Sequence, residues 1–137
     1  MAKGAPDYAP WQGQKRMNAT GGASLFSQSI TIPKNTAIAA AITQDITLMK
    51  GFVTSGEIII PPGCAGLVGL SIYDQATQLY PGTATTWLTG DNADITWDTD
   101  YDVPNVGGTY KLTIHGYNLD DTYQHQPIIR LWVTAYP

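Results

Sequence analysis

Apolar and polar residues alternate along most of the chain beyond residue 24, and a period of two is typical of strands with one buried face. The alternating apolar positions are Phe26, Ile30 and Ile32; Val68, Leu70 and Ile72; Ile95 and Trp97; Tyr110, Leu112 and Ile114; and Ile129, Leu131 and Val133. Two further strands are predicted over 52–60 and 78–80, and the prolines directly after both stretches mark where these strands end. With Gly, Pro, Asn and Asp between them, these patterns predict about eight strands.

The stretch NTAIAAAITQDITLMKG, residues 35–51, fits two interpretations. The apolar residues at helical spacing are Ile38, Ile42, Ile46 and Met49. Ile46 and Leu48 instead alternate as in a strand, and Thr43 and Thr47 favour extended backbone. Because the rest of the chain is predicted to be β, we favour an extended segment with a strand near 44–50.

Short strands separated by turn residues are typical of a β-sandwich or barrel. We therefore predict a single all-β domain over 24–137, an antiparallel sandwich that is jelly-roll-like. Residues 110–117 and 124–135 are expected to pair as a hairpin, closed by the turn residues Asn118-Leu119-Asp120-Asp121.

Residues 1–23 lack this alternation and are predicted to form an extended N-terminal arm. Two Ala-Pro pairs favour extended backbone, and Gly21-Gly22 provides a hinge. Tyr8, Trp11 and Met17 are isolated apolar residues, which suits anchoring in grooves of a partner. Because the arm has no core of its own, we expect another chain to order it.

Charged residues make up 13% of the chain, about half of the usual share, and the net charge is −4. This balance argues against broad nucleic-acid binding, which needs many basic residues to displace counterions. Lys3, Lys15 and Arg16 are three of the seven basic residues, and they lie in the arm with one acidic residue, Asp7. A mildly basic arm on an acidic body favours docking onto an acidic neighbour, with a solvated tail as the alternative.

The sequence shows no run of about 18 apolar residues for a membrane span, and no signal peptide is visible. Cys64 is the only cysteine, so no intrachain disulfide and no oxidising compartment are implied. We therefore expect assembly in a host cytoplasm without membrane association.

On the last predicted strand, Ile128, Trp132 and Tyr136 lie on the side opposite the expected core residues. A strand in a sandwich normally buries only one of its faces. This outward apolar stripe is therefore expected to meet a loop, the arm or another subunit.

The spacing of Asp98, Asp100 and Asp102 matches the start of a calcium-binding EF-hand loop. The sixth and twelfth places of that loop need Gly and a bidentate Glu, but they are Val103 and Thr109 here. An exposed acidic strand edge is therefore favoured, and a calcium site completed by other ligands is the alternative. No cofactor is expected.

No enzyme is predicted. His115 and His125 flank the expected hairpin turn and, with Asp121, are candidate metal ligands, although a hydrogen-bonded structural pair is favoured. Cys64 has no activating base near it in sequence, so a buried core residue is favoured over a nucleophile. The stretch GLSIY lacks the final Gly of a nucleophile elbow. Four Trp and eight Tyr are compatible with a sugar-stacking platform, but Trp97 is predicted to point inward.

The stretches EIIIPPGCAGLVGLSIY, QLYPG, WLTGD and YKLTIHGYNLDDTYQHQPIIRLWV, within roughly residues 50–136, resemble small β-proteins of viral and phage origin. A compact sandwich with an N-terminal arm is also similar to phage capsid decoration (cement) proteins. The resemblance implies a virion structural role with no catalytic residues to carry over.

From this resemblance we expect a virion structural protein, a capsid decoration protein whose arm straps neighbouring subunits. The predicted contact residues are Tyr8, Trp11, Lys15, Arg16, Met17, Ile128, Trp132 and Tyr136. The expected partners are further copies, as a homo-oligomer with a trimer favoured, and other virion proteins such as the major capsid protein. The alternative function is a receptor- or glycan-binding component of a viral tail or spike.

Overall fold

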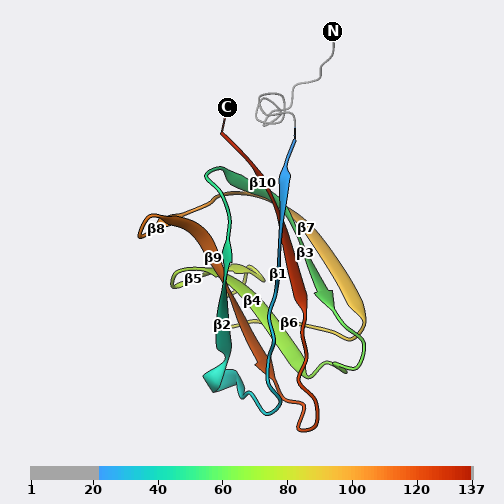
Figure 1. Ribbon diagram of the computed structural model, residues 1–137. Helices are drawn as coiled ribbons and strands as arrows, with labels where there is room; N and C mark the ends of the chain where they lie inside the picture. The colour runs from blue at the N-terminus through green and yellow to red at the C-terminus, as the bar shows by residue number, and fades with distance from the viewer. Residues whose placement is uncertain (1–21, 137) are drawn as a thin grey trace.

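Two antiparallel β-sheets pack face to face in the computed structural model, which describes residues 22–136 (Figure 1). The first sheet has four strands in the order β1-β10-β3-β7. Its strands are β1 (Ser24–Ser29), β10 (Ile128–Thr134), β3 (Phe52–Ile60) and β7 (Ala93–Asp102). The prediction of an all-β antiparallel sandwich is confirmed.

The second sheet has its main strands in the order β2-β9-β4-β5. They are β2 (Ile42–Thr47), β9 (Thr109–Asn118), β4 (Val68–Asp74) and β5 (Thr77–Tyr80). Two short strands extend this sheet, since β6 (Leu88–Thr89) pairs with β4 and β8 (Asn105–Val106) pairs with β9. The chain crosses between the two sheets after β1, β2, β3, β6, β7 and β9, and the jelly-roll-like detail stays a prediction.

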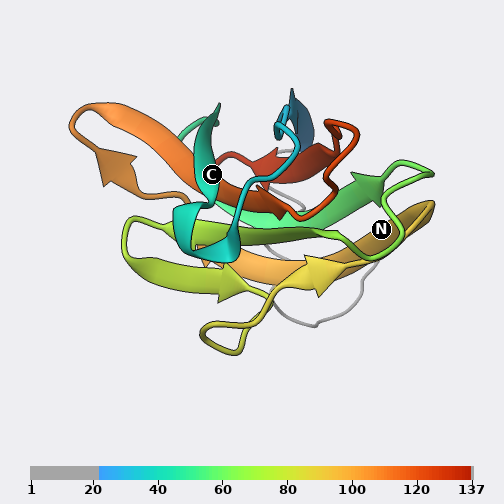
Figure 2. The ribbon, with the colours of Figure 1, turned by 90° about the horizontal axis from the view of Figure 1, so that it is seen from below.

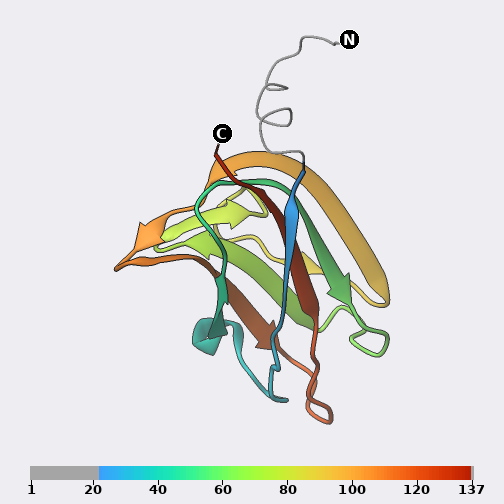
Figure 3. The same cartoon turned by 45° about the horizontal axis from the view of Figure 1, so that its top comes forward.

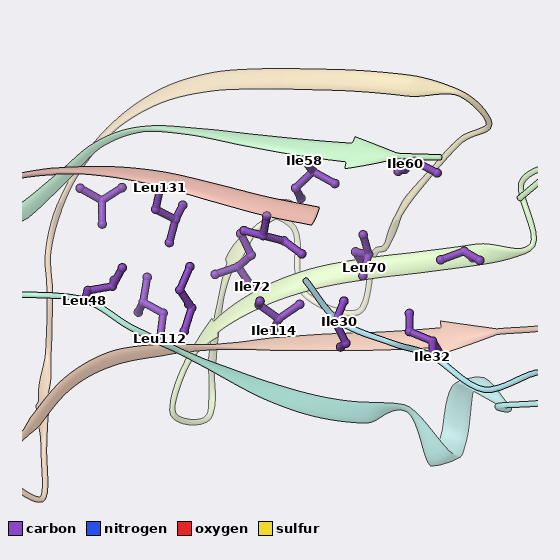
Figure 4. Packing of buried hydrophobic residues seen from close by; sticks show 14 of the residues in the cluster. Ile30, Ile32, Leu48, Ile58, Ile60, Leu70, Ile72, Leu112, Ile114 and Leu131 are labelled. Carbon is purple, nitrogen blue, oxygen red and sulfur yellow. The ribbon is translucent and has the colours of Figure 1, made fainter. Parts of the chain in front are cut away.

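The core lies between the two sheets and is built from the inward residues of the alternating patterns. Ile58, Ile114 and Ile129 are completely buried there. Figure 4 shows Leu131 of one sheet facing Ile72 and Leu112 of the other across the space between the sheets. The faces assigned from the period of two in the sequence are therefore the faces that the structure buries.

Residues 35–51 adopt the extended interpretation rather than the helical one. A single 3-10 turn, η1 (Ile38–Ala40), precedes β2, which starts and ends slightly earlier than the predicted strand near 44–50. Ile46 and Leu48 are both buried, so the alternation identified the core residues of this segment correctly.

The predicted hairpin of 110–117 with 124–135 is wrong. β9 pairs with β2 and β4, whereas β10 pairs with β1 and β3 in the other sheet. The segment between them crosses from one sheet to the other at the end of the sandwich seen from below in Figure 2. Backbone bridges from His125 to Ile32 and from Asn118 to Thr36 hold the crossing, and alternation along one strand carries no information about them.

The first and last described residues lie at the opposite end of the sandwich. Ser24 at the start of β1 pairs with Val133 near the end of β10, and both strands reach the top of the molecule in Figure 1. The segments 30–37 and 119–127, which cross between the sheets at the other end, are therefore separated from the first and last described residues by the length of the strands. This other end is called the far end below.

Candidate interaction surfaces

The outer face of the four-stranded sheet carries apolar side chains in two places. Trp132 pairs with Leu25, which is 50% exposed, and Ile128 pairs with Ile59 on β3. Ile128 and Trp132 are only partly buried, while the alternate residues of β10 are in the core. Two residues of the predicted stripe therefore face outward, as the alternation indicated.

A polar group separates these two apolar places. Arg130 lies between Ile128 and Trp132 on the outer face of β10 and pairs with Glu57, at 3.3 Å between Nη1 and Oε1. A shared hydrogen bond with Asp94 and burial raise the pKa of the Glu57 carboxyl, and Arg130 offsets part of this rise. The outer face is thus apolar at both ends and ionisable at its centre.

Tyr136, the third residue of the predicted stripe, lies beyond the end of β10 and is 43% exposed. Its ring packs against Phe52, with 5.6 Å between ring centroids. A hydrogen bond with Asp102 raises the pKa of its hydroxyl. Tyr136 therefore joins the end of β10 to the strands β3 and β7 beside it.

The three aspartates Asp98, Asp100 and Asp102 are exposed on β7, the outermost strand of its sheet (Figure 3). Charged residues on an edge strand disfavour pairing with a further strand, as the edge interpretation proposed. Within residues 22–136 no group of three or more His, Cys, Asp or Glu side chains is arranged to hold a metal ion. The calcium alternative thus gains no ligand cluster in this part of the chain.

A cavity of about 90 Å³ lies between the sheets on the side of β5 and β7. Its lining residues are Val53, Ile72, Leu79, Tyr80, Trp97, Thr99, Tyr101, Leu112 and Leu131. Thr99 lines the cavity and is also exposed, so the cavity reaches the surface at β7. The strand pairing beside it is irregular, with a register shift between Val53 and Ser55, and such bulges redirect side chains.

Two contacts join the sheets at this cavity. The ring of Trp97 on β7 stacks on Tyr80 of β5, with 4.0 Å between centroids, so the inward prediction for Trp97 is confirmed. Gly56 makes room for the indole, because a Cβ there would lie 2.3 Å from the ring. The Tyr101 hydroxyl donates to Asp74 Oδ2 at 2.5 Å, and this hydrogen bond raises the pKa of Tyr101 to about 12.

The far end of the sandwich is held by a buried polar network around Asn118. The Asn118 amide donates to the carbonyl oxygens of Ile32 and Tyr123, and its Oδ1 accepts from the backbone of Asp120. The Asp120 carboxylate in turn accepts from the backbone of Thr122 and from that of Tyr123. Each polar atom of this completely buried amide therefore has a partner.

The structure does not bring His115 and His125 together. His125 Nε2 lies 2.8 Å from Oδ2 of Asp120, not from Asp121, and this hydrogen bond lowers the pKa of Asp120. His115 instead stacks on Tyr73 on the outer face of the six-stranded sheet, with 3.9 Å between ring centroids. Burial lowers the pKa of His115. The predicted opposition of the two histidines fails because it depended on the hairpin.

Cys64 is completely buried and belongs to the hydrophobic core. Burial, together with the negative charges of Asp91 and Asp120, raises the pKa of its thiol. These effects disfavour the thiolate, which is the nucleophilic form of cysteine. The arrangement agrees with the favoured interpretation of Cys64 as a core residue.

The outer face of the six-stranded sheet carries a cluster of rings that sequence reasoning missed. Besides the stacked pair His115 and Tyr73, Trp87 packs edge-on against Tyr117, at 4.8 Å between centroids. The Ser71 hydroxyl on β4 is completely buried and has no hydrogen-bond partner among the described residues. Alternation predicted outward positions here, but not that a ring of β4 and a ring of the segment before β6 would each pack against a ring of β9.

The five predicted arm contacts, Tyr8, Trp11, Lys15, Arg16 and Met17, lie outside the described residues. Within the part of the chain that is described, no helix has the length and hydropathy of a membrane span.

No family model and no curated protein sequence matches this chain. Among solved structures, it is similar to a chain of the cyanophage Pam1 capsid asymmetric unit, with a TM-score of 0.53 and 15% sequence identity. The match covers 93% of this chain and 91% of that one, and at this identity it shows a shared fold.

Two further likenesses are more distant. The crystal structure of FLHE matches with a TM-score of 0.44 and 7% identity, over 82% of this chain and 98% of that one. A chain of the disulfide-linked pili of Bacillus endospore appendages matches with a TM-score of 0.41 and 16% identity, over 85% and 93% of the two chains.

Proposed function

We propose that this chain is a virion structural protein that decorates and stabilises a capsid. The observation that carries the proposal is the fold shared with a chain of the cyanophage Pam1 capsid structure over most of both chains. Because the two covered shares are nearly equal, the matched chain is similar in length to this one.

The surface chemistry supports a role in assembly. A low share of charged residues suits proteins that spend much of their surface on contacts with neighbours. The outward Leu25, Ile128 and Trp132 provide apolar contact area on one face of the sandwich. In the proposed arrangement this face meets other subunits, the body forms a trimer, and the arm crosses to neighbours such as the major capsid protein. Repeated contacts add through avidity.

The glycan-binding alternative needs open aromatic faces. The three described tryptophans lie in three different places, since Trp97 lines the cavity, Trp132 faces out from β10 and Trp87 contacts Tyr117. On the outer face of the six-stranded sheet the ring of His115 is already stacked on Tyr73. The contacts of Trp97, Trp87 and His115 use ring surface that a sugar would need, and this favours the decoration role.

Co-sedimentation with capsids tests the proposal. The particles are assembled from the capsid genes of the same genome without the gene for this chain, and the chain is added with or without residues 1–23. We expect the full chain to sediment with the particles, and the shortened chain to stay behind while keeping the circular dichroism and melting temperature of a folded sandwich. Binding that survives the deletion would contradict the strapping role, and a full chain that never binds would overturn decoration.

A further inference from the structure

We propose that the segment Lys15-Arg16-Met17 of one copy docks on strand β7 of a second copy and inserts the Met17 side chain into the cavity beside it. This inference rests on the proposed strapping function and names where the arm would bind within the homo-oligomer. Three observations carry it: the size and lining of the cavity, the charge on the strand that borders it, and the position of the arm in the chain.

The cavity suits one slender apolar side chain. At about 90 Å³ it is smaller than the engineered cavities of about 150 Å³ that accept benzene. Its walls combine aliphatic residues with the rings of Tyr80, Trp97 and Tyr101. Methionine is unbranched and flexible, it fills irregular gaps, and its sulfur makes favourable contacts with aromatic rings. Among the isolated apolar residues of the arm, Met17 fits this space better than the larger Tyr8 and Trp11.

The border of the cavity is acidic where the preceding residues of the arm are basic. The exposed Asp98, Asp100 and Asp102 alternate along β7 with Thr99 and Tyr101, which line the cavity. Lys15 and Arg16 directly precede Met17 in the sequence. A segment with Met17 in the cavity therefore places its two positive charges beside a row of carboxylates, and this complementarity fixes register and partner choice.

The position of the arm favours a second copy over the same molecule. The described chain starts beside β1, at one edge of the four-stranded sheet, and β7 is the opposite edge. Three strand spacings separate the edges by about 14 Å. Met17 lies five positions before Gly22, and the chain between their Cα atoms spans at most about 17 Å, so docking within one molecule needs a nearly straight path across the sheet. A neighbouring copy removes that constraint.

Disulfide trapping tests where Met17 goes. Met17→Cys and Thr99→Cys are combined in the full chain, with Cys64→Ala so that only the introduced thiols react. On mild oxidation we expect covalent species of two or more chains on non-reducing gels, with the 17–99 link identified by mass spectrometry. The control replaces Thr99→Cys by Thr43→Cys, an exposed residue on β2 of the other sheet. Yields equal to this control would overturn docking at β7, and a link only within single chains would overturn the second copy.

Charge reversal provides a second readout. Lys15→Glu with Arg16→Glu is expected to reduce the yield of the 17–99 link several-fold, and adding Asp98→Lys with Asp102→Lys is expected to restore it. Lys34→Glu with Lys50→Glu serves as the matched control and should leave the yield unchanged. A yield insensitive to these changes would contradict the charge argument. If the link is absent while capsid binding still requires residues 1–23, only this inference fails; if the link forms without capsid binding, only decoration fails.

Discussion

The two places where the sheets meet outside the central core are held together differently. At the far end, a buried amide and a carboxylate satisfy the backbone of two crossing segments, with Asn118 completely buried and bonded to Ile32, Tyr123 and Asp120. At the β5–β7 edge, a ring stack and one hydrogen bond border an apolar cavity of about 90 Å³.

This difference means that the far end contributes to stability, whereas the β5–β7 edge has room to accept another group. A buried polar network is stabilising only when every member has a partner, so the far end tolerates little change. The side chains around a cavity forgo contacts that a filled core would make, so this edge gains stability when something fills it.

The largest effect is expected from Asn118→Ala. The substitution leaves the carbonyl oxygens of Ile32 and Tyr123 and the backbone N–H of Asp120 without their partner in a buried site. We expect the free energy of unfolding to fall by about 3 kcal/mol, measured by urea denaturation. Asn105→Ala is the control, because that exposed side chain accepts one hydrogen bond, from Gly108. Similar losses for both variants would show that the far end is not specially stabilised.

A smaller effect on stability is expected from Asp120→Asn, and this effect depends on pH. The folded-state pKa of Asp120 is lowered from 3.8, so its contribution to stability is present above that value and is lost as the pH falls through the folded-state pKa. We expect Asp120→Asn to melt at a lower temperature than the natural chain at about pH 5, with the difference shrinking toward about pH 2. Scanning calorimetry across this range provides the measurement, and a difference independent of pH would contradict a role for the carboxylate charge.

The smallest effect is expected from filling the cavity. Val53→Ile adds one methylene to a residue that lines it, and we expect a gain of up to about 1 kcal/mol in the free energy of unfolding. The matched control, Val133→Ile, adds the same group to a completely buried residue away from the lining and is expected to cost about 1 kcal/mol or more by overpacking. If both variants lose stability equally, the edge is as tightly packed as the rest of the core.

The sequence predicted which face of each strand is buried better than it predicted which strands pair. Alternation placed Ile58, Leu112 and Leu131 in the core correctly, because a strand's period depends only on which of its faces is buried. It wrongly assigned β9 and β10 to one hairpin. The segment between these strands crosses from one sheet to the other and bonds to residues far away in sequence, such as Ile32, and alternation does not reveal such bonds. The outcome for the two histidines followed from that error.

The cavity and the ring cluster lay beyond prediction for a related reason. The cavity lies beside a register shift at Val53 and Ser55, and the ring of Trp97 fits only because Gly56 opposite it has no side chain. Neither feature has a period or a motif, since each arises from the fit of several strands. The outward orientation of Ile128 and Trp132 could be predicted because it depends only on the alternation of β10.

Because Ser24 and Val133 are paired neighbours, cargo fused to the C-terminus would emerge next to the root of the arm and compete with it for space. The tip formed by Gly107 and Gly108 belongs to the short turn joining β8 to β9 and is exposed to solvent. A peptide tag inserted there would leave the arm's exit clear, which makes this tip the better position for labelling or display.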